Sequence, residues 1–227
     1  MTKSLSSYDV YLEIGQKRTF ASVIAWPGWC RMGRDETVAL QALFEAGPRY
    51  AHILRPTRLG LQLPQDASAF VVVERLKGNA TTDFGAPDLA PARDAESIDD
   101  DELRRFQSIL EASWQALDVA VENARGKSLR VGPRGGGRTI DGILEHVQGS
   151  EISYLSSLGG KVTSTGALEP SLQKTRQAIL DTLKASAHGE IAERGPRGGK
   201  RWLPRYFVRR VAWHVLDHVW EIEDRMM

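Results

Sequence analysis

Apolar residues recur at intervals of three and four positions from about residue 101 to the end of the chain. This spacing places them along one side of an α-helix, and such a helix is stable when that side is buried against another element. Four segments of this kind, joined by sizeable connections, predict a four-helix bundle over residues 101–227. The predicted helices span residues 102–123, 139–158, 168–185 and 204–225, the last opening with Pro204.

The first third of the chain has a different periodicity. Residues 8–14 alternate between polar and apolar side chains, as a half-buried β-strand does. Residues 19–26 form a second strand-like run, which ends at a Pro-Gly pair. Residues 69–73 are almost entirely apolar and β-branched or aromatic, and they predict a buried strand.

Between these strands, Asp35 is a suitable N-cap for a helix over residues 36–54, which we expect to break near Gly47 and Pro48. Residues 78–100 contain glycine, proline and acidic residues without periodicity, and this indicates a linker between two domains. The predicted fold class is therefore α+β. Its parts are a small N-terminal α/β domain at residues 7–77, the linker at residues 78–100 and the helical bundle at residues 101–227.

Composition excludes several classes of protein. The single cysteine, Cys30, excludes an intrachain disulfide and a cysteine-rich zinc site, and a reducing, cytoplasmic setting is expected. Lys and Arg number 30 against 29 Asp and Glu, so the charge gives no reason to expect a nucleic-acid partner. No apolar run approaches the roughly 18 residues that a membrane span needs, and the first seven residues lack the apolar core of a secretory signal. We expect no membrane association.

Two histidines, His214 and His218, lie four residues apart in the last predicted helix and therefore on one side of it. Two imidazoles at this spacing can reach one metal ion with bonds of about 2.0–2.1 Å. His218 falls within the apolar stripe of the helix and His214 at its edge, where a neutral imidazole needs partners for both nitrogens. The pattern predicts either a metal site or two core histidines that carboxylates satisfy.

A third ligand must come from another helix. His146 is the candidate, although it lies off the centre of the apolar stripe of the helix over residues 139–158. Glu151 lies within that stripe, and a carboxylate at an apolar position needs a partner. Three roles stay open for Glu151, our candidate catalytic residue: a fourth ligand, an acceptor that orients an imidazole, or half of an ion pair with an arginine.

Two similar glycine-rich segments, residues 132–138 and 195–201, precede the second and fourth predicted helices. One interpretation is a pair of anion-binding loops, in which backbone N–H groups and arginines hold a carboxylate or phosphate. The alternative is two polar loops that share turn chemistry, since neither matches a phosphate-binding loop. The candidate cofactor-binding residues are Arg134, Arg138, Arg197 and Arg201.

Residues 138–155 and 209–218 together resemble the DinB/YfiT-like family of four-helix-bundle metalloenzymes. The resemblance covers roughly residues 100–225, and it depends on one histidine in the second helix and an HxxxH pair in the fourth. It implies a divalent metal, often zinc or nickel, bound by His146, His214 and His218 in front of an open cavity. Characterised relatives include transferases and isomerases that use mycothiol, bacillithiol or glutathione, so it also implies a low-molecular-weight thiol.

Residues 20–28, followed by Gly33 and the helix after Asp35, are similar to the HicB-like fold of antitoxin and orphan domains. In that fold a strand ends in Pro-Gly, and a further glycine precedes a helix. Cys30 falls one position later than the family's usual cysteine, and no DNA-binding segment is appended. Such a module is expected to dimerise or to cover the bundle, and we expect a homodimer.

The predicted function is that of a metal-dependent enzyme. A three-histidine site with an open coordination position would activate a low-molecular-weight thiol or a water for attack on a small-molecule substrate, as in a thiol transferase or a hydrolase. The HExxH motif is absent, so a metalloprotease with a glutamate base is not expected. The alternative is a non-catalytic module, in which the HicB-like part recognises a protein partner and the helices form a dimerising scaffold.

Overall fold

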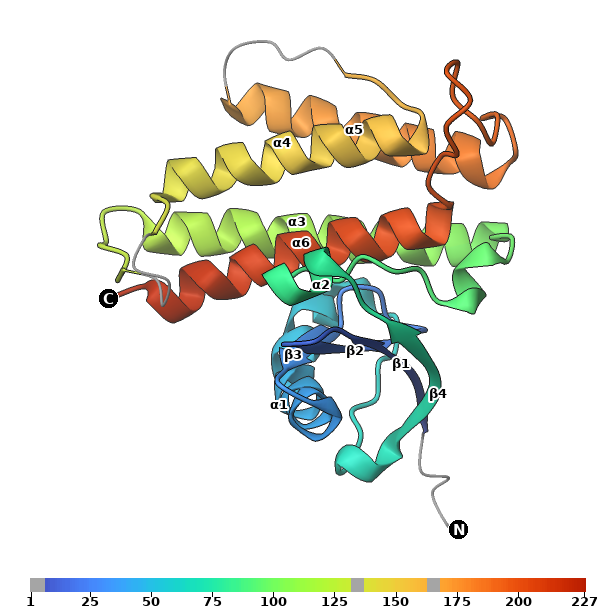
Figure 1. The fold of residues 1–227 in the computed structure, drawn as a ribbon. Helices are drawn as coiled ribbons and strands as arrows, with labels where there is room; N and C mark the ends of the chain where they lie inside the picture. Colours follow the sequence, from blue (N-terminus) through green and yellow to red (C-terminus); the bar gives the residue numbers. More distant parts are fainter. Residues whose placement is uncertain (1–6, 132–136, 163–167) are drawn as a thin grey trace. The chain divides into compact units, whose positions relative to one another are not determined.

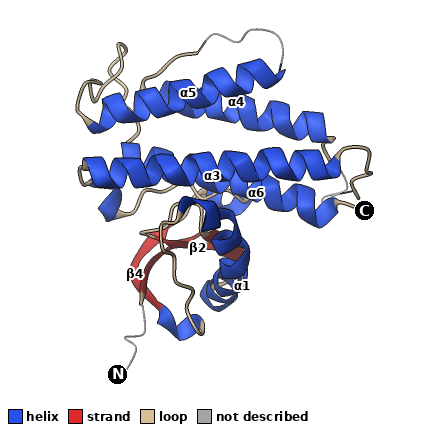
Figure 2. Ribbon diagram, turned by 180° about the vertical axis from the view of Figure 1, so that it is seen from behind, coloured by secondary structure: helices blue, strands red, loops and turns tan. Residues whose placement is uncertain are grey.

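The computed structural model describes residues 7–131, 137–162 and 168–227. The chain divides into two compact units, Met1–Glu96 and Ser97–Met227. The first contains all the named strands and is called the sheet unit, and the second is called the helical unit (Figures 1 and 2). The predicted α+β class, with a sheet first and helices after it, is confirmed.

The sheet unit contains β1 (Tyr8–Ile14), β2 (Thr19–Val23), β3 (Cys30–Gly33), α1 (Glu36–Leu54) and β4 (Phe70–Lys77), with short 3-10 helices at Arg55–Thr57 and Ala67–Ala69. The strand order is β3-β2-β1-β4. β1 and β2 are antiparallel, as are β2 and β3, whereas β4 lies parallel to β1. A parallel pair needs a crossover connection, and α1, which packs against β2 and β3, lies in that connection.

The second predicted strand is shorter than expected, and a third strand follows it. β2 ends at Val23, after which the chain turns and β3 pairs back onto β2. Gly28 lies in this turn with a φ of 92°, a conformation that favours glycine. The Pro-Gly pair therefore marks a hairpin turn, and the four residues of β3 are too few to give a recognisable alternation.

The expected break in the first helix is absent, because α1 continues through Pro48 to Leu54. Proline in a helix removes one backbone hydrogen bond, at a cost of about 3 kcal/mol. Burial around Trp29 offsets this cost: its ring stacks on Tyr50 at 5.6 Å and its Nε1 donates to the Leu43 carbonyl at 2.8 Å. A Cβ on Gly47 would lie 3.1 Å from the Trp29 ring, so a glycine fits where this ring meets the helix.

Residues 78–96 form part of the sheet unit, whereas the sequence predicted a linker there. They contain α2 (Ala80–Phe84) and the 3-10 helix Ala92–Ala95. The buried carboxylate of Glu13 on β1 holds this segment, because it accepts hydrogen bonds from the Thr82 hydroxyl and from the backbone N–H groups of Asp88 and Leu89. A single buried acid thus fixes a stretch that shows no hydrophobic periodicity.

Replacing Glu13 by alanine should destabilise the sheet unit by about 2–4 kcal/mol, because three donors around the buried carboxylate lose their acceptor. Glu74→Ala is the matched control, since the half-exposed Glu74 carboxylate accepts from a single donor, the backbone N–H of Ala92. Urea unfolding followed by circular dichroism measures both variants. Equal losses of stability in the two would contradict the anchoring role of Glu13.

The helical unit contains α3 (Asp100–Ala124), α4 (Ile140–Leu158), α5 (Leu168–Ala187) and α6 (Pro204–Arg225), each within two residues of the predicted bounds. The side chains of Asp99 and Thr139 cap the first turns of α3 and α4. In the part of the chain that the structure describes, no helix has both the length and the apolar character needed to cross a bilayer.

The four helices lie side by side, with α3 and α6 running in one direction and α4 and α5 in the other (Figure 1). At one end of the unit, Arg205 near the start of α6 pairs with Glu102 near the start of α3. Also at this end, the Trp202 N–H donates to the Ser157 carbonyl at 2.9 Å, which places the start of α6 beside the end of α4. Because α4 and α6 are therefore antiparallel, the middle of α4 faces the middle of α6.

Candidate metal centre

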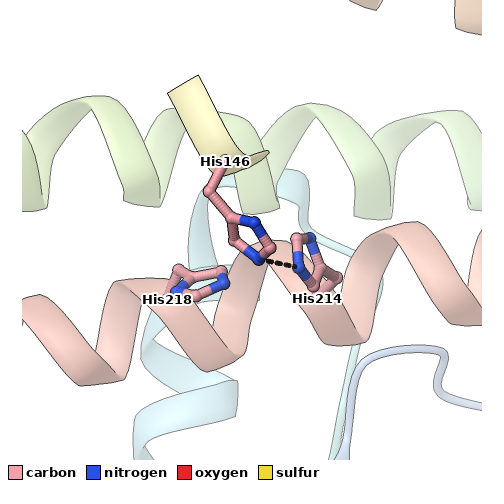
Figure 3. Close-up of side chains that lie close together, drawn as sticks. All are labelled: His146, His214 and His218. Carbon is pink, nitrogen blue, oxygen red and sulfur yellow. Dashed lines mark hydrogen bonds between the residues drawn. The ribbon is translucent and has the colours of Figure 1, made fainter. Parts of the chain in front are cut away.

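The three predicted histidines lie together where α4 and α6 pack against each other (Figure 3). His146 projects from α4, and His214 and His218 project from consecutive turns of α6. One nitrogen from each ring belongs to a group whose members all lie within 4.8 Å of one another. His214 and His218 are buried and His146 is half-buried. We call these three residues the histidine cluster.

The spacing of the rings is compatible with a shared ion. The Nε2 atoms of His146 and His214 are 3.1 Å apart, and the His218 ring centroid lies 5.0 Å from that of His146 and 4.7 Å from that of His214. A tetrahedral ion with bonds of about 2.0 Å holds its ligand nitrogens about 3.3 Å apart. The closest pair therefore already has the separation that such an ion requires.

The off-centre position of His146 has a structural reason. The apolar stripe of α4, which includes Val147 and Leu155, is buried inside the helical unit. His146 lies beside this stripe, on the side of α4 that α6 approaches, and its ring meets the His214 ring with centroids 5.0 Å apart. The position of His146 at the edge of the apolar stripe is thus suitable for a ligand that lies between two helices.

Burial favours the neutral imidazole at two members of the histidine cluster, His146 and His214. Desolvation lowers the pKa of His146, and the positive charge of Arg138 lowers it further. Desolvation likewise holds the pKa of His214 well below its usual value, with contributions from His218 and His146. Neutral imidazole is the form that offers a lone pair to a metal.

Glu221, one turn beyond His218 on α6, is a site residue that the sequence analysis missed. Its Oε2 lies 2.8 Å from His218 Nδ1, and its Oε1 accepts from Arg225 Nη1 at 2.5 Å. The hydrogen bond from His218 lowers the pKa of Glu221, so the carboxylate is ionised and accepts only. Nδ1 of His218 must then carry the proton, which leaves the lone pair on Nε2 for the centre of the cluster.

Glu221→Gln should lower the affinity for a divalent ion about 10- to 100-fold, because a neutral amide holds the His218 tautomer less firmly than a carboxylate does. Competition with a chromogenic chelator measures this affinity for zinc. Glu145→Gln is the control, since Glu145 is an exposed acid on α4 next to His146 in the sequence. Unchanged zinc affinity in Glu221→Gln would show that the carboxylate does not support the site.

The structure does not bring Glu151 into the histidine cluster. This fully buried residue accepts a hydrogen bond from Trp114 Nε1 of α3 at 2.6 Å, and its other oxygen has no hydrogen-bond partner within the described residues. Burial raises the pKa of its carboxyl from 4.5 to about 7, an effect that the nearby Arg176 reduces. Arg176 itself makes a two-fold pair with Asp118 at 2.8 Å. Among the roles left open, the geometry is closest to a core carboxylate beside an arginine.

Glu151 should make the protein less stable as the pH rises. The folded chain holds this proton more tightly than the unfolded chain, so its stabilisation is complete below about pH 4.5 and is lost as the pH rises through 7. Between pH 5 and pH 8 the loss should reach roughly 2–3 kcal/mol relative to Glu151→Gln, which resembles the protonated acid. Urea unfolding at both pH values, with Glu111→Gln as an exposed control, measures the difference. A wild-type slope equal to that of Glu151→Gln would contradict the prediction.

The candidate arginines divide between opposite ends of α4. Arg138 lies two residues before the start of α4, whereas Arg134 lies outside the described residues. Arg197 and Arg201 lie in the segment before α6, and Arg201 Nη1 would be 2.5 Å from a Cβ on Gly159, just past the end of α4. Thirteen residues of helix, or about 20 Å, separate His146 from Gly159. The described residues Arg138 and Arg201 therefore do not meet at one site.

Two aromatic residues, Tyr154 and Trp202, border the His214 side of the cluster, and the sequence analysis did not predict them there. The Tyr154 ring lies 5.8 Å from the His214 ring and 5.2 Å from the Trp202 ring. Arg210 Nη2 donates to the Tyr154 hydroxyl at 3.3 Å, and the guanidinium lies over this ring. Tyr154 and Trp202 are half-exposed, so they can contact a molecule that approaches the cluster.

Comparison with known proteins gives no match: no family model, no curated protein and no solved structure is similar to this chain. The candidate centre therefore stands on its own geometry. That geometry consists of three converging imidazoles and one carboxylate that orients an imidazole, with His146 and the neighbouring Tyr154 only half-buried.

Proposed function

We propose that the helical unit binds a divalent ion through His146, His214 and His218 and is the catalytic part of a metal-dependent enzyme. The observation that supports this proposal is the convergence of three ring nitrogens from two helices within 4.8 Å. Two of them come from one helix at the i, i+4 spacing, and the third comes from a position 68 residues away in the sequence from His214. Burying the His214 and His218 imidazoles beside the half-buried His146 is costly unless their nitrogens have polar partners, and one ion can partner all three rings.

The donor set suits zinc or nickel. Imidazole nitrogen is a ligand of intermediate softness that both ions accept, and three histidines with an open fourth position are typical of catalytic rather than structural zinc sites. Within the described residues, no carboxylate belongs to the histidine cluster. This arrangement differs from that of proteases in which a glutamate between the two histidines acts as a base.

The reaction we propose is attack by a low-molecular-weight thiol or a water on a small electrophile. A bound ion at this site would provide an open position and would lower the pKa of the thiol or water that occupies it. Glu221 would keep His218 in the tautomer that can bind the ion. Tyr154 and Trp202 would flank the approach on the His214 side and exclude water from part of it. The choice of a thiol is supported by the resemblance to the DinB/YfiT-like family.

Wild-type protein purified without an affinity tag and loaded with zinc should retain about one equivalent after desalting. The double variant His214→Ala with His218→Ala should retain almost none, because one ligand remains of three. His52→Ala is the control, since His52 is exposed on α1 in the other unit. Inductively coupled plasma mass spectrometry measures the metal, and thermal unfolding should show stabilisation by zinc in wild type and in His52→Ala. Equal, near-zero retention in wild type and in the double variant would refute the proposed site.

A further inference from the structure

A pocket of about 710 Å³ lies at the end of the helical unit where α3 ends and α4 begins. This volume is in the range of small-molecule sites. Four cationic side chains and a single carboxylate, that of Asp141, are among the described residues that line it. The cations are Arg125, Lys127, Arg138 and Arg225.

Two of these cations already have carboxylate partners. Arg125 pairs with Glu122 at 2.9 Å, and Arg225 pairs with Glu221 at 2.5 Å. Lys127 and Arg138 form no ion pair with a described residue, so two positive charges face the single charge of Asp141. The first turn of α4 adds the partial positive charge of a helix N-terminus. The pocket is therefore suited to an anion.

Arg138 connects this pocket to the histidine cluster. His146 follows Gly142 by four residues on α4, so these two positions lie on one side of its first turns, and Arg138 lies two residues before the helix. A Cβ on Gly142 would lie 3.4 Å from Arg138 Cβ and 3.9 Å from its Cγ, which places the side chain beside the glycine one turn before His146.

We infer that the molecule used by the proposed enzyme carries a carboxylate or phosphate group, and that Arg138 binds this group at the boundary between the pocket and the histidine cluster. The inference rests on the proposed function and adds a substrate class to it. An exposed guanidinium without an ion pair can make a two-fold, charge-assisted contact with either anion. The charged group would sit on Arg138, and the remainder of the molecule would occupy the pocket or extend toward His146.

Calorimetric titration of the cobalt-loaded full chain with inorganic phosphate, succinate and uncharged succinamide tests the inference. Wild type should bind the two anions at least ten times more tightly than succinamide. Arg138→Gln should lose about tenfold in anion affinity and nothing in succinamide affinity, because it removes one charge-assisted contact. Arg197→Gln is the matched control, since Arg197 lies in the other glycine-rich segment and is exposed. It should behave as wild type does.

A second readout separates a binding role from a structural one. Cobalt should bind Arg138→Gln at least as tightly as wild type, because the substitution removes a positive charge near the ion site. The titrations are repeated without metal, where the effect of Arg138 should persist. If wild type takes up no cobalt, the proposed function fails while the metal-free titration still tests Arg138. Anion affinities that are absent, or equal in wild type and Arg138→Gln, would overturn the inference.

Discussion

The contact between His146 and His214 is the constraint on which the proposed metal site depends. Their Nε2 atoms are 3.1 Å apart in a buried setting, where two positive rings would repel strongly and two lone pairs need a common partner. One hydrogen bond pairs the facing nitrogens of two rings, whereas one cation can accept a lone pair from each of the three. The third ring, that of His218, is hydrogen-bonded to Glu221, and Glu221 pairs with Arg225. Arg225 also donates to the carbonyls of Arg130 and Arg138. The end of α6 is thereby tied to the segment that leads into α4, so the site and this end of the fold stabilise each other.

Much of the helical unit could be predicted from the sequence because long amphipathic helices carry a strong periodic signal. The bounds of α6 were predicted to the residue, with Pro204 as the start. The sheet unit was harder, since β3 has only four residues and the path of residues 78–96 depends on hydrogen bonds to the buried Glu13. The break predicted at Pro48 was wrong, because helix propensity describes only local sequence. The tertiary contacts of Trp29 stabilise α1 through this position.

The site was predictable to the extent that its ligands share one helix or fit a family pattern. The i, i+4 spacing identified His214 and His218, but the sequence could not show that α6 approaches α4 on the side of His146. Glu221 was missed although its spacing is informative, since it lies three residues after a candidate ligand and four before an arginine. Glu151 was a candidate because it is a carboxylate in an apolar stripe, but its hydrogen-bond partner is Trp114 on α3 and not a histidine of the cluster. Hydrophobic periodicity alone does not predict which side chains of two helices point toward each other.

X-ray absorption spectroscopy of the zinc-loaded full chain tests the central claim most directly, because it reports the ligands of the ion itself. The account predicts three imidazole nitrogens at about 2.0–2.1 Å and one further light atom. Substitution of His146 should reduce the imidazole count by one. A spectrum with fewer than three imidazoles in wild type, or one that the loss of His146 leaves unchanged, would contradict it.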